Sequence, residues 1–349
     1  MSRREWFQIL IVTVVTAFLL VFSGTVSAQG NSGNAFERVK EVQEQHTNEL
    51  MAMAGVVGTA VGENEGGQLA VLVLLEHGAV VIPRELEGVP VRPLVTGKIE
   101  ALQGGGKPGG SASALTPASW WPRPVPIGVS TGHPAITAGT IGCRVTNGST
   151  VYALSNNHVY ANANRATIGN AVIQPGTYDG GTSPADDIAN LSAFSRINFD
   201  GSNNTIDAAI AAIKPISTTD SRPRVGNATP SNGYGIPSRT TAAAYLRQAV
   251  QKYGRTTSLT KGKVYALNAT VNVSYGDLNG DGHDEVAHFV GQIVITPGNF
   301  SAGGDSGSLI VTQTGNRPVG LLFAGSNSVT IANPIDLVLS YFGVSVDGQ

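Results

Sequence analysis

The hydrophobic positions of the chain follow three different patterns in turn. Residues 9–22 form one continuous apolar run. Apolar positions then recur at steps of three and four residues, the period of an amphipathic helix, at Phe36, Val39, Val42, His46, Leu50 and Met53. After Gly55 the pattern changes to short β-type runs, namely GVVGTAVG, QLAVLVLL and VPVRPLVTGKIEAL. These patterns predict a small α+β unit in which one helix packs on three or four strands.

From residue 122 onward the pattern is typical of an all-β chain. Gly-, Asn-, Asp- and Pro-rich turns separate short apolar runs, and the predicted strands lie in GTIGCRV, STVYALS, NTIDAAIAAI, KGKVYAL, ATVNVSY, VAHFVGQIVI, GSLIVTQ and PVGLLFAG. One helix is predicted among them, in residues 241–254. A set of short strands joined by such turns favours a barrel or a sandwich, and residues 122–349 are enough for two small barrels.

The acidic residues mark a domain boundary between these two parts. Of the 12 Glu residues, 11 lie at or before Glu100, whereas all 12 Asp residues lie at or after Asp179. Between them the chain has the Gly, Ser and Pro composition of a linker. We therefore predict an α+β domain in residues 29–102, a linker in residues 103–121 and a β domain in residues 122–349.

The first residues have the features of a targeting segment. Arg3 and Arg4 precede the apolar run, and Val26-Ser27-Ala28 offers small residues for cleavage. The run has 14 residues, whereas a membrane span needs about 20. We predict a signal peptide in residues 1–28 and a location outside the cell or in its envelope. The alternative is an uncleaved anchor, which would be the chain's only contact with a membrane.

Charge and cysteine content exclude several classes of protein. The net charge is −2, with 13% charged and 41% hydrophobic residues, and there is no long basic run. This composition argues against nucleic acid as the main partner and against a disordered chain. The single cysteine, Cys143, excludes an internal disulfide framework and a zinc site built from cysteines.

The strongest chemical motif is the sequence AGGDSGSLI in residues 302–310. It places Ser306 on a glycine-rich turn before an apolar strand. Glycines allow backbone N–H groups to converge where side chains would obstruct them. A nucleophilic serine needs such N–H groups and a nearby base. The same string also occurs as an ordinary hairpin turn, so the base must be found elsewhere.

The order of residues along the chain selects the base. The six histidines all precede Ser306 and are His46, His77, His133, His158, His283 and His288. A serine–acid–histidine order is therefore impossible for this serine. His158 ends the apolar segment VYALSNNHV, which presents an imidazole at a strand edge, and no aspartate precedes it. The remaining order for His158 is histidine, aspartate, serine.

Two aspartates between His158 and Ser306 are candidates for the acid. Asp207 lies in NTIDAAIAAI, where apolar neighbours would hold its carboxylate against the core. Asp187, in ADDIANL, also precedes an apolar stretch. We favour Asp207, because a buried charge is costly without a partner.

These landmarks together resemble the trypsin-like (chymotrypsin-fold) serine proteases, and in particular a secreted member of bacterial type. The segments are GTIGCRV, VYALSNNHV, NTIDAAIA, GGDSGSLI and PVGLLFAG, in that order. The resemblance implies two β-barrels with the site between them. It further implies that His158 is the general base, that Asp207 orients it and that Ser306 is the nucleophile. Backbone N–H groups of Gly304 and Ser306 would form the oxyanion hole.

The resemblance has consequences for the pocket and for the cysteine. Phe300, Phe323 and Gly325 would line the pocket for the substrate side chain, and no acid other than Asp305 lies in those segments. Cleavage after Lys or Arg is therefore not implied. Val159 stands where animal enzymes have a cysteine, so Cys143 is expected to be a buried free thiol. A freed N-terminus often orders the oxyanion loop in such enzymes, but nothing in this sequence marks a processing site.

A second motif, DLNGDGHDE in residues 277–285, has the oxygen spacing of a calcium loop. Side-chain oxygens stand at positions one, three, five and nine, and His283 offers a carbonyl at position seven, so that the predicted ligands are Asp277, Asn279, Asp281, His283 and Glu285. The spacing resembles dockerin and FG-GAP-type loops, without the Glu that a true EF-hand has at position twelve. The alternative is a solvated acidic hairpin.

The sequence thus predicts a secreted serine endopeptidase that acts on polypeptides as a monomer, through an acyl-enzyme and without a cofactor for catalysis. Calcium would be structural only. The N-terminal domain would be a propeptide or an accessory module. The alternatives are a non-catalytic binding protein on a protease scaffold and a calcium-dependent surface interaction module.

Overall fold

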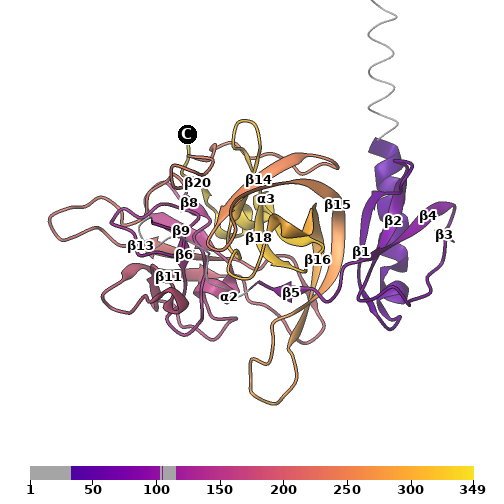
Figure 1. The fold of residues 1–349 in the computed structure, drawn as a ribbon, viewed down its shortest axis with the longest axis horizontal. Coiled ribbons are helices and arrows are strands. Elements are labelled where there is room, and N and C mark those ends of the chain that lie inside the picture. Colours follow the sequence, from indigo (N-terminus) through magenta and orange to yellow (C-terminus); the bar gives the residue numbers. More distant parts are fainter. Residues whose placement is uncertain (1–32, 103, 105–114) are drawn as a thin grey trace, which may run out of the picture.

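The computed structural model describes residues 33–102, 104 and 115–349. The predicted signal peptide and most of the predicted linker lie outside these residues. The described chain is mainly β, as predicted, with a small N-terminal unit beside a larger body built from two sheets (Figure 1). Within these ranges, no helix has the length and apolar character needed to cross a bilayer.

A closed barrel forms one half of the larger body. Six antiparallel strands pair in a ring, because the two ends of the series pair with each other. In ring order they are β14 (Ala249–Gly254), β15 (Ser258–Ser274), β16 (Val286–Thr296), β19 (Thr330–Pro334), β18 (Pro318–Gly325) and β17 (Leu309–Thr312). Closure leaves no unpaired edge in the ring.

The other half of the body is a six-stranded antiparallel sheet. Its strands, in spatial order, are β10 (Ala171–Ile173), β11 (Asp187–Phe194), β13 (Ala209–Ile213), β9 (Val151–Ser155), β8 (Cys143–Thr146) and β20 (Ser345–Val346). A two-stranded sheet of β6 (Ser130–Thr131) and β7 (Gly139–Thr140) precedes β8. Cys143 is a free thiol in this core, as expected, and burial raises its pKa to about 12.

The N-terminal unit consists of a helix in residues 33–51 and a small sheet. The sheet contains β1 (Val56–Glu63), β2 (Leu69–Leu75), β4 (Val89–Val95) and β3 (Glu85–Leu86). Strand β2 is apolar throughout because both of its faces are buried. Val71 and Val73 pack with the helix, whereas Leu72 and Leu74 pack with the barrel.

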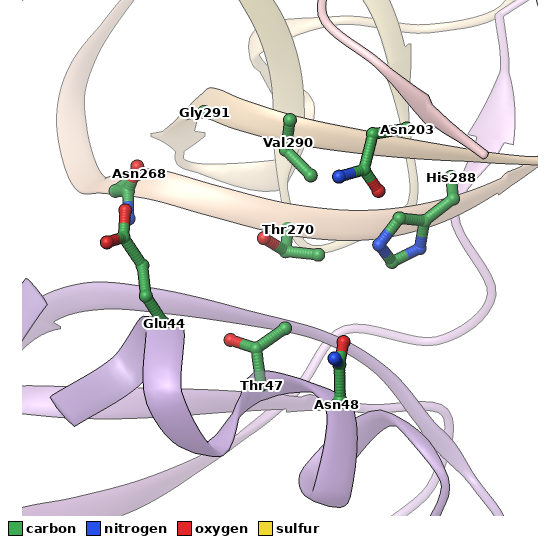
Figure 2. Close-up of a pocket in the computed structure, with 9 residues that line it drawn as sticks. All are labelled: Glu44, Thr47, Asn48, Asn203, Asn268, Thr270, His288, Val290 and Gly291. Carbon is green, nitrogen blue, oxygen red and sulfur yellow. The ribbon is translucent and has the colours of Figure 1, made fainter. Parts of the chain in front are cut away.

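The N-terminal unit extends the sheet of the barrel. Strand β1 pairs antiparallel with β15, with Gly58 opposite Val271 and Thr59 opposite Thr270. Beside this strand pairing lies a polar pocket of about 350 Å³ between the helix and the barrel (Figure 2). Figure 2 shows side chains of the helix facing those of β15 and β16 across it, and Asn268 donates to Glu44 Oε1 at 3.0 Å.

The prediction of a helix in residues 241–254 is wrong. Residues 249–254 form strand β14, and residues 241–248 are not helical. Strand β14 pairs with β15 on one side and with β17 on the other. These two ladders satisfy its backbone groups and override the helical propensity of the alanine-rich stretch.

Candidate active site

His158 lies at the start of the short helix α2 (Asn157–Tyr160), directly after strand β9. Its imidazole is fully buried, and Nδ1 lies 2.5 Å from Asp207 Oδ2. The backbone N–H of His158 donates to the other carboxylate oxygen at 3.3 Å. An ionised carboxylate only accepts hydrogen bonds, so Nδ1 carries a proton in this contact. One carboxylate therefore holds both the ring, through Nδ1, and the backbone of His158.

The other nitrogen of the ring is available. Within the described part of the chain, His158 Nε2 is buried and has no hydrogen-bond partner. Buried polar atoms are almost always paired, and an exception needs an explanation. An acceptor held in this state is suited to take a proton from a neighbouring hydroxyl group.

Asp207 is fully buried just before strand β13 and is fixed from several sides. The hydroxyl of Tyr275 donates to Asp207 Oδ2 at 2.8 Å. Asn156 donates to the Asp207 carbonyl at 2.7 Å, and Asn333 accepts from its backbone N–H at 3.0 Å. The bonds from Tyr275 and His158 offset the cost of burying the carboxylate, and those of Asn156 and Asn333 hold the backbone of Asp207.

The competing aspartate has a different partner. Asp187 accepts a hydrogen bond from Lys214 Nζ at 2.7 Å, and this pair is partly exposed on the six-stranded sheet. The structure therefore brings Asp207, and not Asp187, to His158.

Ser306 lies in the turn that enters strand β17 of the barrel and is fully buried. The turn needs glycine on both sides, because Gly304 and Gly307 have φ angles of +94° and +93°. A Cβ atom at Gly307 would also lie 2.1 Å from Ser155 Oγ. The Ser306 hydroxyl donates to the carbonyl of Phe323 at 2.9 Å.

The segments that carry Ser306 and His158 meet between the two sheets. A Cβ atom added at Gly139 would lie 2.5 Å from the side chain of Val159, the residue after His158, and 3.2 Å from the Ser306 carbonyl oxygen. Thr140 donates its backbone N–H to that same carbonyl at 2.8 Å. The three predicted residues thus lie at the junction of the barrel and the six-stranded sheet.

A peptide carbonyl of the chain itself already lies at the predicted oxyanion site. The backbone N–H of Gly304 donates to the Leu102 carbonyl at 2.8 Å, and Leu102 donates its own N–H to Phe323 at 3.2 Å. The preceding residues form β5 (Glu100–Ala101), which pairs antiparallel with β18. In Figure 1, β5 runs from the N-terminal unit toward the middle of the body.

A buried ion pair supports the turn that carries Ser306. Lys252 Nζ lies 3.2 Å from Asp305 Oδ2, and both side chains are fully buried. Asp305 also accepts from the backbone N–H of Thr256 at 2.8 Å and of Ala302 at 3.0 Å. Burial lowers the pKa of Lys252, and the Asp305 carboxylate opposes that effect.

The predicted pocket residues lie in two different environments. Gly325 lines a cavity of about 450 Å³ next to Leu102. The rings of Phe300 and Phe323 are fully buried and pack in the barrel cores instead. Phe323 packs against Phe289 with the two rings tilted and their centroids 4.7 Å apart. Strand β18 is buried on both faces, so the sequence did not indicate toward which face the side chain of Phe323 would point.

Three residues of the site were missed by sequence reasoning, namely Tyr275, Lys252 and Asn333. Tyr275 follows strand β15 and Asn333 lies in β19, so both come from parts of the chain far from Asp207. Their types and spacing carry no motif, and only the closure of the barrel reveals their role.

We expect Tyr275→Phe to lower kcat/KM about 10-fold or more, because a hydrogen bond to a charged group contributes about 1.5–3 kcal/mol. The ring contacts with His158 and Phe199 would remain. Burial and the Asp207 carboxylate hold the pKa of Tyr275 well above its usual value, so its hydroxyl stays a donor. Peptide hydrolysis measures the effect. The exposed Tyr341→Phe is the matched control, and equal losses in both variants would contradict a positioning role for Tyr275.

In the loop of residues 277–285, side-chain oxygens accept hydrogen bonds from backbone N–H groups of the same loop. Asp277 Oδ2 accepts from the backbone N–H of Gly282 at 2.9 Å. The side-chain oxygen of Asn279 accepts from the N–H of Asp281 at 2.9 Å, and the Asp281 carboxylate accepts from the N–H of His283 at 2.8 Å. Across the described ranges, no three His, Cys, Asp or Glu side chains are grouped so that they could hold a metal ion. Calcium binding stays a prediction from the sequence, and no step of catalysis depends on it.

If this loop binds calcium, millimolar calcium is expected to raise the melting temperature, and Asp281→Ala is expected to remove that gain. A dissociation constant of about 10⁻⁴–10⁻³ M is typical of extracellular modules. Melting curves in calcium and in chelator provide the measurement, and identical curves for the unmodified protein would rule the site out.

The comparisons with known proteins agree with the motifs. The chain is 31% identical over 149 residues to Serine protease 1 of Streptomyces fradiae. The chain resembles a bacterial serine protease. The match covers 35% of this chain and only 38% of that relative, and no protein-family model matches. The resemblance inferred from the sequence is thereby confirmed for this stretch.

Solved structures of serine proteases also align with the chain. A glutamic-acid-specific serine protease has 24% sequence identity and a TM-score of 0.44, and the alignment covers 64% of this chain and 100% of that one. Protease A of Thermobifida fusca has 19% identity and a TM-score of 0.43, with 64% and 99% covered.

Proposed function

We propose that the protein is a secreted serine endopeptidase that hydrolyses polypeptides through His158, Asp207 and Ser306. The observation that carries the proposal is the presence of two groups in one site. His158 Nε2 is buried without a hydrogen-bond partner among the described residues, and the N–H of Gly304 donates to a peptide carbonyl. A base without a partner and a donor that holds a carbonyl are the two groups that a serine nucleophile requires.

The chain's own groups supply each step of the proposed reaction. The Ser306 hydroxyl turns from Phe323 toward His158, gives its proton to Nε2 and attacks the carbonyl carbon. The Gly304 N–H stabilises the oxyanion, together with that of Ser306. Asp207 stabilises the imidazolium. The imidazolium then protonates the leaving amine, and water releases the acyl group from Ser306.

Domain roles and location follow from the sequence as part of this proposal. Residues 122–349 would be the protease domain, and residues 29–102 would be a propeptide or accessory domain. Export would depend on residues 1–28. The proposal also includes monomeric action on polypeptides with no cofactor in catalysis.

Covalent labelling with a fluorophosphonate distinguishes this function from a non-catalytic binding role. We expect one label per chain, mapped by mass spectrometry to the peptide that contains Ser306, and none in Ser306→Ala. Ser345→Ala, an exposed serine in β20, should label like the unmodified protein. Prolonged incubation allows the probe to compete with Leu102. An unlabelled Ser306 in folded protein would favour the binding role.

A further inference from the structure

The segment Glu100–Leu102 lies against the barrel as an added strand. Ala101 is opposite Ala324 and Glu100 is opposite Gly325 in antiparallel register, and Leu102 continues the ladder to Phe323. Such strand addition is a common way to bind an extended peptide, because main-chain bonds hold it whatever its sequence. The strand that receives it, β18, is the one whose Phe323 carbonyl also binds the nucleophile.

The carbonyl of Leu102 lies between the oxyanion donor and the nucleophile. It accepts from Gly304 at 2.8 Å, while the N–H of Leu102 and the hydroxyl of Ser306 share one acceptor, the Phe323 oxygen, at 3.2 and 2.9 Å. Two donors on one carbonyl oxygen must be neighbours. Leu102 is therefore the residue of this segment whose carbonyl is bound by the predicted oxyanion donor and whose N–H lies beside the Ser306 hydroxyl.

The side chain of Leu102 occupies an uncharged subsite. It packs against the barrel core, and a Cβ atom at Gly325 would lie 3.4 Å from Leu102 Cδ1. The adjoining cavity is lined by small or neutral residues of the barrel, which include Gly298, Asn299, Ala302, Gly303, Gly325 and Ser326. Among the described residues that line this cavity, Glu100 alone is charged, and it belongs to the bound segment itself. The subsite therefore suits an apolar side chain of the size of leucine.

Gly104 lies against the segment between β6 and β7. A Cβ atom at Gly104 would lie 3.0 Å from the carbonyl oxygen of Ala138, between β6 and β7. Leu102 is thus held by the barrel and Gly104 by the opposite side of the site.

The N-terminal unit fixes this position. Its apolar face, with Leu72 and Leu74, packs in one core with the barrel. Ser274 then donates its N–H to the carbonyl of Ile99 at 3.0 Å, just before the cleft. The substrate segment is therefore delivered by a docked domain, which gives it a high effective concentration.

Resting on the proposed function, we infer that the protein prefers bonds that follow leucine and that its first substrate is its own bond after Leu102. Ser306 Oγ bonds to the Leu102 carbonyl carbon as the bond to the next nitrogen breaks, and His158 gives that nitrogen its proton. Water then hydrolyses the ester, leaving a carboxylate at Leu102 and restoring the serine hydroxyl. Residues 103–349 leave with a new amino terminus.

Intact mass and N-terminal sequencing of the full chain test this inference. We expect two fragments, the second beginning at residue 103, that form at a rate independent of protein concentration. Ser306→Ala should stay intact. Leu102→Asp should slow cleavage about 100-fold or more, because the charged side chain would lose its hydration in an apolar subsite. Leu102→Met, whose side chain is also apolar, should be cleaved at close to the normal rate. Added Glu-Ala-Leu anilides should be cleaved at least about 100-fold faster than Glu-Ala-Asp anilides.

Fluorophosphonate labelling, run on the same samples, separates the two proposals. Labelled Ser306 with an intact bond after Leu102, with cleavage at another bond, or with no preference for the leucine anilide would overturn the inference and leave the protease function in place. Cleavage whose rate rises with protein concentration would overturn the self-cleavage part. Loss of labelling together with loss of all hydrolysis would overturn the protease function itself.

Discussion

Ser306→Ala and His158→Ala are each expected to lower kcat by about 10⁶-fold, and the double variant is expected to lose no more than either single variant. Residues that act as one unit in a serine protease triad lose their effect together, so the losses do not add. Nucleophile and base serve one step, in which the Ser306 proton moves to the unpartnered Nε2 of His158. The residual rate would come from the Gly304 donor and from substrate binding.

Asp207→Asn is expected to lower kcat by about 10⁴-fold, because an amide holds the imidazole in the wrong tautomer. The effect should be smaller than that of Ser306→Ala, since the oxyanion donor and nucleophile remain. Asp187→Asn is the matched control. It breaks a partly exposed pair with Lys214, which should change stability by at most about 1 kcal/mol and leave kcat near normal.

Hydrolysis of a leucine peptide and thermal unfolding of each variant provide the measurements. Unchanged melting temperatures with lost activity would assign the loss to chemistry. Near-normal hydrolysis by Ser306→Ala would exclude the proposed mechanism. A loss in Asp187→Asn with a normal Asp207→Asn would transfer the orienting role to Asp187.

The sequence could predict the proposed catalytic groups because their order along the chain is restrictive. With every histidine before Ser306, only a few arrangements of base, acid and nucleophile remained, and burial distinguished Asp207 from Asp187. The contact of 2.5 Å between His158 and Asp207 agrees with that choice. The strands on either side were equally readable, since β-branched runs between turns have few alternatives.

The supporting groups could not be predicted, because barrel closure brings them together from distant segments. Tyr275 is 68 positions from Asp207 in the chain and donates to it. The helical prediction for residues 241–254 failed for a related reason. The same segment, once paired on both sides as β14, supplies the buried Lys252 beneath the nucleophile turn.

Lys252 stabilises the turn that carries Gly304 and Ser306 in the uncut chain. In the family that the sequence resembles, a freed N-terminus often orders this turn. Here Asp305, between Gly304 and Ser306, is paired with an internal lysine and with three backbone N–H groups. Cleavage after Leu102 is therefore not needed to build the site, and its effect would be to clear the cleft.

Lys252→Met is therefore expected to reduce both stability and turnover. Removing one partner of a buried ion pair leaves an uncompensated charge and typically costs about 3–5 kcal/mol. Asp305 would move toward water and carry Gly304 with it, and loss of one oxyanion donor lowers kcat about 10²–10³-fold. KM should change less than kcat, because the ladder between β18 and the substrate remains.

The matched control for this effect is Lys214→Met, which removes the cation of the partly exposed pair with Asp187 and should cost about 1 kcal/mol or less. The double variant Lys252→Met/Asp305→Asn removes both buried charges and should recover most of the stability, since neutral replacements of a buried pair are often tolerated. Urea unfolding gives the stability, and kcat per labelled Ser306 gives turnover of the folded fraction. If Lys252→Met lost stability but kept normal kcat per labelled site, the ion pair would serve folding alone, and the turn would owe its shape to its glycines and backbone bonds.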